Sequence, residues 1–428
     1  MNRARYSRFI CGATLVNGAR VQSRSGLVEQ SPLSAAVPWL LPRAVYLHIP
    51  FCAHRCGYCD FATVAGRDAL ASRYLDALAA ELTTLGQPAE VETVFIGGGT
   101  PTYLTHADLE RLLVLVRNWF ILAGGYEWTV EANPGTLDRT KVHLLADHGV
   151  TRVSLGAQSF HRSLLKVLER NHDPDDVPRA VELVRSRIQN LSLDLIFGVP
   201  GQELSAWRED LDAALRLQPS HLSAYGLTYE KGTPLWKQRE AGVVKPVDEE
   251  LERQMYAEAM DRISSAGLVQ YEIANFARPG FECRHNLVYW ANHAYHGFGL
   301  GAARYVQGRR AINTRELDAY MGRALRGESP EQQAEVLTPL ERAAETAMLH
   351  IRRCRGIDRR AFREQTGFEL DEIAGKAVQR HVEGGLLADD GESVRLTREG
   401  RFLADLVCSA FLESPGAGSA APGPGSTS

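Results

Sequence analysis

Short β-branched runs alternate with amphipathic segments along the chain, and this alternation constrains the fold more than any other feature. Six runs predict strands, each followed by a helical segment. Parallel strands need a long crossover of this kind, whereas antiparallel strands can be joined by a tight turn. Six units are too few to close an eight-stranded barrel, so we expect an α/β fold with an open, partial (β/α)6 barrel. The predicted strands span 44–48, 92–98, 127–133, 152–157, 191–198 and 221–227, and the clearest helices span 69–85, 106–120 and 203–217.

Residues that can bind ligands or metals follow the predicted strands, whereas few such residues precede the strands. Ligands of barrels and of open α/β sheets gather at the carboxyl ends of the strands. Because these residues lie at one end of the strands only, the sequence predicts a single ligand site on one face of the barrel. The residues in question are the cysteines after the first strand, "GGGTP" (97–101), Glu131, Asn133, Gln158, Asp194, Thr228 and Glu230.

The character of the sequence changes after about residue 245, where a long helix (248–267) precedes an aromatic, glycine-rich stretch. Farther on, "LLADDGESVRLT" predicts a two-strand wing between helices, and hence a mostly helical, winged-helix-like module. We therefore divide the chain into an unstructured leader (1–43), the barrel (44–245), an extension (246–334), the module (335–412) and a disordered tail (413–428).

The leader carries five arginines and no acidic residue before Glu29. This composition is compatible with an organellar transit peptide, with an unstructured extension, or with a start assigned too early. Scattered glycine and asparagine make a poor amphipathic helix, which favours the last two interpretations. The tail is rich in proline, glycine and serine, which predicts disorder.

Composition and charge narrow the class of protein. The net charge of −4 and the absence of a basic stripe argue against a nucleic-acid partner. The predicted wing carries Asp389, Asp390 and Glu392, which argues against DNA binding by the module. No apolar stretch reaches the length of a membrane span, which leaves at most a peripheral contact with a membrane. Seven cysteines, three of them clustered, do not form a disulfide pattern and predict a reducing, cytoplasmic location.

Three of these cysteines, Cys52, Cys56 and Cys59, lie with CxxxCxxC spacing directly after the first predicted strand. Thiolates are the usual ligands of iron–sulfur clusters, and three of them leave one iron of a cubane open to another ligand. Three buried structural cysteines, or a zinc site completed from elsewhere, are the alternatives. Glycine and polar residues around the cysteines argue against buried packing.

The cysteine loop resembles that of radical S-adenosylmethionine (SAM) proteins. From about residue 45 to 412 the chain resembles, more closely, the oxygen-independent coproporphyrinogen III oxidases and the related HemW family of heme chaperones. The resemblance implies a 4Fe-4S cluster whose open iron is chelated by SAM, which an electron from the cluster cleaves to methionine and a 5′-deoxyadenosyl radical. It rests on "YLHIPFC", "FIGGGTPTYL", "EANPGTL", "RVSLGAQSF", "LDLIFGVPGQ" and "YEIANFARPG".

The resemblance also assigns SAM contacts. Taken alone, a glycine run can be a mere tight turn, and tyrosines are more often packing residues. A carboxylate in an apolar strand needs a partner, so Asp194 either contacts a ligand or pairs with Arg170. Whether one or two SAM molecules bind is left open. The assigned contacts are Tyr46, Tyr58, Gly98, Gly99, Thr100, Glu131, Gln158, Arg170 and Asp194, with Thr228 as a weaker candidate.

Phe61 separates the two related families. The oxidases carry a further cysteine two residues after the third, whereas HemW-type chains carry Cys-x-Phe, as "CDF" does here. The first predicted strand also begins near residue 44, without the long N-terminal segment of the oxidases. Both features favour the heme chaperones.

HemW-type chains also carry an HNxxYW motif, which "HNLVYW" matches. The imidazole of His285 can ligate heme iron, and Tyr289 and Trp290 can pack on a porphyrin. A satisfied histidine in a packed loop is the alternative, and Cys283, His293 and His296 are other candidate iron ligands. One departure is "GLGAARY", where Ala303 and Arg304 replace a His-Ser pair usual in the family.

The sequence thus predicts a heme chaperone that binds a 4Fe-4S cluster, SAM and heme, without coproporphyrinogen oxidase activity. Its implied partners are heme, an electron donor for the cluster, and recipient hemoproteins such as respiratory cytochromes. Two alternatives stay open. One is an oxidase that decarboxylates coproporphyrinogen III, and the other is a radical SAM enzyme with an unrelated substrate.

Overall fold

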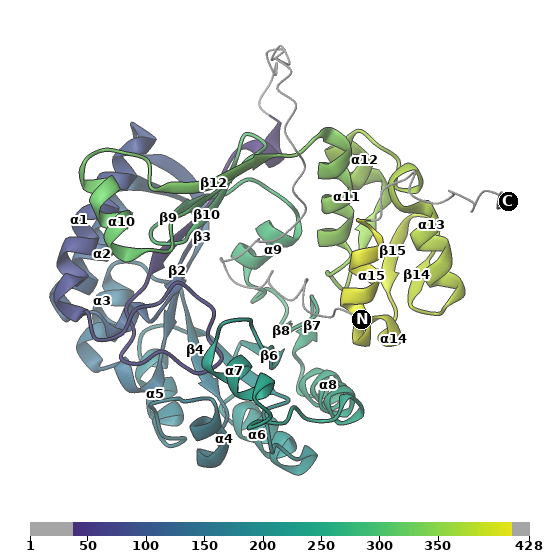
Figure 1. Cartoon of the computed structure of the whole chain (residues 1–428), viewed down its shortest axis with the longest axis horizontal. Coiled ribbons are helices and arrows are strands. Elements are labelled where there is room, and N and C mark those ends of the chain that lie inside the picture. The colour runs from purple at the N-terminus through teal and green to yellow at the C-terminus, as the bar shows by residue number, and fades with distance from the viewer. Residues whose placement is uncertain (1–36, 413–428) are drawn as a thin grey trace, which may run out of the picture.

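A computed structural model describes residues 37–412 and contains the predicted partial barrel (Figure 1). Strands β1 to β6 lie side by side in chain order, and each neighbouring pair is parallel. This order is what successive strand–helix units produce when every connection is a crossover of the same hand. The six strands are β1 (Ala44–Ile49), β2 (Ala89–Gly98), β3 (Phe120–Ala132), β4 (Arg152–Gln158), β5 (Asn190–Phe197) and β6 (His221–Gly226).

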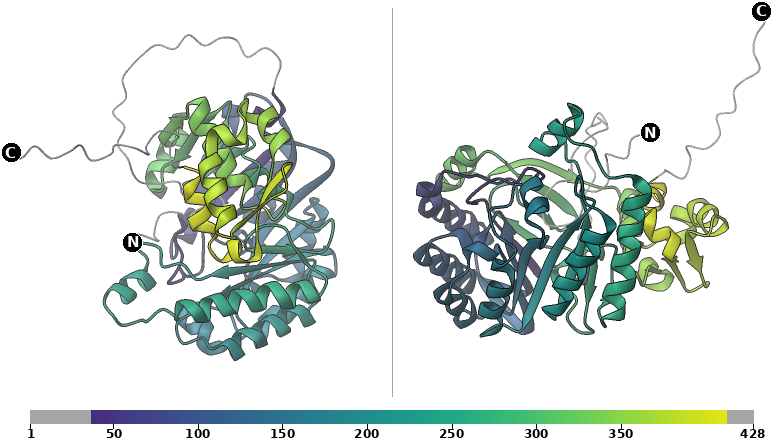
Figure 2. Two further views of the ribbon diagram at one scale, coloured as in Figure 1. Left: turned by 90° about the vertical axis from the view of Figure 1, so that its right-hand side faces the viewer. Right: turned by 90° about the horizontal axis from the view of Figure 1, so that it is seen from below.

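The crossover helices cover the outer face of the sheet (Figures 1 and 2). Each buries an apolar stripe, as Leu75, Leu78 and Leu82 do on the first helix. These stripes and the strand residues beneath them form one continuous core. The helices are α1 (Ala71–Leu82), α2 (His106–Trp119), α3 (Arg139–Asp147), α4 (Arg162–Val167), α5 (Asp176–Arg185) and α6 (Leu204–Arg216).

Short strands that the sequence analysis did not predict extend both edges of the sheet. Strand β9 (His296–Phe298) pairs parallel to β1, and β8 (Asn275–Ala277) pairs antiparallel to β6 and to β7 (Val269–Gln270). Runs of two or three residues are too short for a readable alternation of polar and apolar side chains. Their places depend on pairing with strands distant in the sequence.

A buried carboxylate on the first barrel helix ties the extension to the barrel. Glu81 on α1 accepts hydrogen bonds from Tyr320 Oη (2.6 Å), Asn313 Nδ2 (2.7 Å) and Gly299 N (2.8 Å). A carboxylate can accept about four hydrogen bonds, and the three that Glu81 accepts compensate it for its burial. The helix α7 (Pro234–Glu240) follows β6 within the barrel range. Besides β7, β8 and β9, the extension comprises α8 (Glu249–Ser265), α9 (Arg284–Trp290), β10 (Ala303–Val306), β11 (Arg309–Asn313), α10 (Leu317–Leu325) and β12 (Glu331–Val336).

The C-terminal module has its own apolar core and contains the predicted wing as the hairpin of β14 and β15. Figure 2 shows it at one side of the barrel, where Arg398 on α14 pairs with Asp261 on α8 at 2.7 Å. The module comprises α11 (Pro339–His350), β13 (Ile357–Asp358), α12 (Arg359–Thr366), α13 (Leu370–Glu383), β14 (Leu387–Asp389), β15 (Ser393–Leu396), α14 (Arg398–Phe402) and α15 (Ala404–Ala410).

The basic part of the predicted leader and the predicted disordered tail (413–428) lie outside the described residues. The end of the leader that is described, residues 37–43, forms a short 3₁₀ turn (Pro38–Leu40) and contacts the barrel. Ala294 N donates to Trp39 O at 2.8 Å, and Glu92 N donates to Arg43 O at 2.6 Å. Between residues 37 and 412, no helix is both long and apolar enough to cross a membrane.

His350 makes the stability of the module interface dependent on pH. Its buried ring donates from Nε2 to Ala291 O at 3.2 Å, and burial lowers the pKa of His350 to about 3, with Arg353 acting in the same direction. The unfolded chain, with a histidine pKa near 6.5, therefore binds the proton more readily than the folded chain. This contribution to stability is complete above about pH 6.5 and is lost as the pH falls toward the folded-state value.

We predict that His350→Gln, which retains an N–H donor but does not titrate, reduces this pH dependence. Between pH 7 and pH 5.5, the variant should lose about 1 kcal/mol less unfolding free energy than the wild type. Urea denaturation at both pH values measures the difference. Equal losses in the two proteins would show that His350 does not titrate in this way.

Candidate functional site

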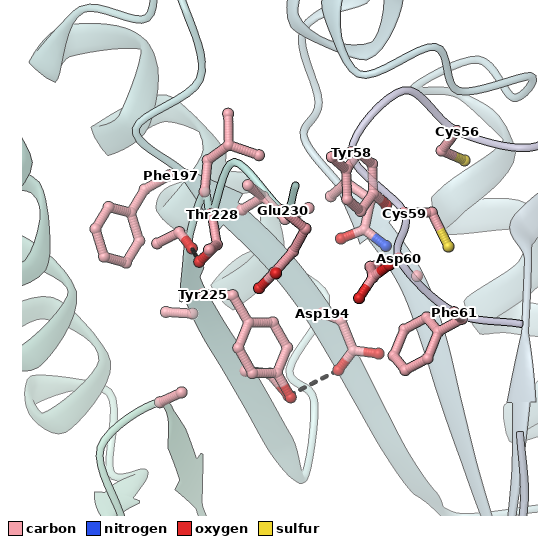
Figure 3. Close-up of a pocket in the computed structure, with 18 of the residues that line it drawn as sticks. Cys56, Tyr58, Cys59, Asp60, Phe61, Asp194, Phe197, Tyr225, Thr228 and Glu230 are labelled. Atoms are coloured by element: carbon pink, nitrogen blue, oxygen red, sulfur yellow. Dashed lines mark hydrogen bonds between the residues drawn. The ribbon is translucent and has the colours of Figure 1, made fainter. Parts of the chain in front are cut away.

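A cavity of about 2140 Å³ opens at the carboxyl ends of the strands and extends to the C-terminal module (Figure 3). Residues of the six central strands or of the loops that follow them line it, together with parts of α8, α14 and α15. Cavities that hold one small ligand usually measure about 300 to 1,000 Å³. This one has room for more than one ligand.

The cysteine loop is pinned at both ends. Val64 N donates to Pro50 O at 2.8 Å and Cys52 N donates to Val64 O at 3.0 Å, which closes the loop beside the end of β1. A buried histidine adds a third tie: His48 Nε2 donates to Ala62 O at 3.0 Å, and its Nδ1 accepts from Tyr46 Oη at 3.0 Å. The segment "YLHIPFC" therefore fixes where the loop carries its thiols.

All three loop cysteines are half-buried free thiols that line the cavity. Thr100 Oγ1 lies 3.6 Å from Cys52 Sγ, and Arg170 Nη1 donates to Cys56 Sγ at 3.5 Å. Burial raises the pKa of Cys52 to about 12 and that of Cys59 to about 11. The thiolate forms of these cysteines therefore need additional positive charge, which a metal centre supplies.

The arrangement fits a cluster better than a single metal ion. In the described part of the chain, no three histidine, cysteine or carboxylate side chains converge as ligands of one ion. The zinc alternative requires such convergence. In a cubane cluster each thiolate binds a different iron, so the sulfur atoms need not converge on one point.

The glycine turn after β2 is required by close packing. Gly98 has φ +103°, and a Cβ atom there would lie 2.3 Å from the ring of His48. At Gly99 a Cβ atom would lie 2.7 Å from Ile49 O. The tight-turn interpretation therefore holds, and both glycines and Thr100 also line the cavity. Gly98 N donates to Glu131 Oε2 at 2.9 Å, which holds that carboxylate against the turn.

Arg170 and Asp194 occupy separate parts of the cavity wall. Arg170 Nη2 donates to Gly156 O at 2.8 Å, whereas its buried Nε has no partner. Asp194 accepts from Ser223 Oγ at 2.7 Å and Ser154 Oγ at 2.9 Å, and burial raises its pKa. The alternative ion pair between Arg170 and Asp194 is not found in residues 37–412.

The remaining predicted SAM contacts divide into two groups. Tyr58, Gln158 and Thr228 line the cavity, and Gln158 has φ +64°, a strained conformation for a residue with a side chain. Tyr46 is buried against Phe95 and does not line the cavity, and it is connected to the cysteine loop by its hydrogen bond to His48.

His285 is a buried and satisfied histidine. Its exposed fraction is 1%, Thr93 Oγ1 lies 2.9 Å from Nδ1, and Tyr289 Oη lies 2.8 Å from Nε2. Burial lowers its pKa to about 3. Neither ring nitrogen is available to a metal without a rearrangement. Of the other candidate iron ligands, Cys283 lines the cavity and His293 is exposed.

Several cavity residues were not predicted from the sequence. Arg152, His221 and Ser223, near the amino ends of β4 and β6, line the deeper part of the cavity. Tyr225 lies beside Asp194 (Figure 3). An arginine at the start of an otherwise apolar strand, in "RVSLGA", is the one signal that could have pointed to Arg152.

We predict that His285→Ala lowers the unfolding free energy by about 2 to 4 kcal/mol, because it leaves a void and removes the hydrogen-bond partner of the buried Thr93 hydroxyl. The matched variant His293→Ala, eight residues later and exposed, should cost less than about 0.5 kcal/mol. Urea denaturation of both proteins measures this. Similar costs would contradict the structural role of His285.

Comparison with known proteins places this geometry in a family. Residues 46–214 match the radical SAM superfamily, and residues 337–403 match the HemN C-terminal domain. The chain is 35% identical over 376 residues to the heme chaperone HemW of Bacillus subtilis (strain 168), covering 86% of this chain and 99% of that protein. It is 33% identical over 383 residues to the heme chaperone HemW of Escherichia coli (strain K12), covering 87% and 99%.

One solved structure supports the fold over nearly the whole chain. The coproporphyrinogen III oxidase HemN of Escherichia coli, described as a radical SAM enzyme, superposes with a TM-score of 0.76. The match covers 88% of this chain and 91% of that one at 23% sequence identity. At this identity the similarity establishes a shared fold only.

Proposed function

Because the chain belongs to the HemW heme chaperone family of radical SAM proteins, we propose that it binds heme and transfers it to hemoproteins. The observation that carries this proposal is the cysteine loop, in which three thiols line the cavity and Phe61 stands where the oxidases carry a further cysteine. Recipients of the class of respiratory cytochromes, a cytoplasmic location and an electron donor for the cluster belong to the same proposal.

The three loop cysteines, Cys52, Cys56 and Cys59, would hold a 4Fe-4S cluster. SAM would bind beside it, against the cavity wall. Together these groups supply one-electron chemistry when bound. Arg170 donates a hydrogen bond to the sulfur of Cys56, and Gly98 N holds Glu131 in place. The proposed SAM contacts are Tyr58, Gly98, Gly99, Thr100, Glu131, Gln158, Arg170 and Asp194, with Thr228 at the edge of the cavity.

Heme would be held by the region around 271–305, which includes the HNxxYW motif. Iron ligation by His285 would require it to leave Thr93 and Tyr289. The exposed His293 needs no such change, whereas Cys283, which lines the cavity, would have to leave Glu127. We also propose the division into barrel (44–245), extension (246–334) and winged-helix-like module (335–412).

The discriminating experiment reconstitutes the cluster anaerobically and offers two substrates separately. With heme, we expect a bound-heme absorption spectrum and transfer to a heme-free cytochrome. With coproporphyrinogen III, SAM and a reductant, we expect no protoporphyrinogen. Formation of protoporphyrinogen together with 5′-deoxyadenosine would establish the oxidase alternative and overturn the chaperone proposal.

We predict that Cys56→Ser abolishes most of the visible absorbance of the cluster, because thiolates are its usual ligands and a serine hydroxyl is a poor iron ligand. Cys354→Ser is the matched control, since Cys354 is also a half-buried free cysteine but does not line the cavity. It should retain the full absorbance and iron content. Full absorbance in Cys56→Ser would disprove the cluster assignment.

A further inference from the structure

Arg152, the first residue of β4, is a buried cation without an anionic partner. Its exposed fraction is 2%, and its side chain lines the deep part of the cavity. Nη1 makes one long hydrogen bond, to Phe281 O at 3.3 Å, and Nε has no partner. Within residues 37–412, Arg152 forms no ion pair.

The nearest acidic groups are already occupied. Glu127 accepts from Cys283 Sγ (3.6 Å) and from the backbone N–H groups of Arg284 and His285 (both 3.1 Å). Asp194 accepts from the hydroxyl groups of Ser154, Ser192 and Ser223. Both carboxylates act on Arg152 only over a distance.

Such an arginine is costly unless an anion reaches it. Guanidinium stays protonated in proteins, and burying a charge without a partner costs several kcal/mol. Buried charges are therefore normally paired. Since Arg152 faces a cavity and not the packed core, the missing partner can be supplied by a ligand.

The groups around Arg152 suit a polar ligand. His221, also on the cavity wall, has Ser192 Oγ at 2.8 Å from Nδ1 and Tyr271 Oη at 2.8 Å from Nε2, and burial lowers its pKa far below the usual range. It is therefore neutral and does not compete for an anion. Asn275 Oδ1, buried and lining the same region, has no partner and can accept a hydrogen bond.

We propose that Arg152 is a ligand-binding residue that receives a carboxylate at the floor of the cavity. A guanidinium group can bind a carboxylate through two parallel hydrogen bonds, and Nε is one of the donors used in this geometry. The identity of the ligands rests on the proposed function: heme carries two propionates, and SAM carries one carboxylate. The experiment distinguishes these two sources.

The test measures the affinities of the cluster-loaded wild type, Arg152→Gln and Arg152→Lys for four ligands. These are heme, heme dimethyl ester, SAM and decarboxylated SAM. If a heme propionate binds Arg152, Arg152→Gln should bind heme about 10- to 100-fold more weakly, and Arg152→Lys should recover part of the loss. Esterification should weaken binding to the wild type by a similar factor and have little effect in Arg152→Gln. If instead only the affinities for SAM and decarboxylated SAM changed in this way, the carboxylate at Arg152 would be that of SAM.

Two results would overturn the proposal. One is unchanged affinity for heme and for SAM in Arg152→Gln. The other is an equal loss for each ligand and its carboxylate-free analogue, which would show a purely structural role. Arg360→Gln is the control for the loss of an arginine elsewhere on the protein, because this side chain is 90% exposed. It should bind both ligands as the wild type does. If the wild type bound no heme at all, the chaperone proposal would fail while the SAM pair still tested Arg152.

Discussion

The site depends on the close approach of the ends of β1 and β2. Ile49 pairs with Gly98, and the chain beyond each strand folds over the other: Gly99 N donates to Ile49 O at 2.8 Å, and Thr100 N donates to Phe51 O at 2.9 Å. Only glycine fits at residue 98, because a side chain would meet the ring of His48. This approach brings Thr100 next to Cys52 and so joins the cysteine loop to the glycine turn.

The parts of the fold that the sequence predicts correctly are those with local patterns. The six parallel strands, the helix at 248–267 and the wing are each long enough to show periodicity or a turn signal. Strand β12 (Glu331–Val336) is the opposite case. Its sequence "EQQAEV" is mostly polar and shows no strand pattern, and it forms a strand by pairing with β11.

The site shows the same division. The cysteines and glycines could be located from spacing, since their chemistry is readable in a few consecutive residues. The burial of His285 could not, because its partner Thr93 and the carboxylate of Glu127 come from strands more than 150 residues earlier. Arg152 was missed for a related reason. From sequence alone, a single arginine in a strand is interpreted as a surface residue. Only the fold shows that Arg152 lies in the wall of a cavity.

Several features of the cavity wall lower the stability of the fold. It holds a strained Gln158, unpartnered nitrogen atoms on Arg152 and Arg170, and thiols whose burial disfavours the charged form. Each would be unfavourable in an apolar core, and each is tolerated where a bound group can compensate it. The compensation needed has both signs, because the thiolates need a cation whereas the two arginines need acceptors. A cationic iron–sulfur core beside ligands that carry carboxylates would meet both demands, so the electrostatics of the cavity wall and the chemistry of the family agree.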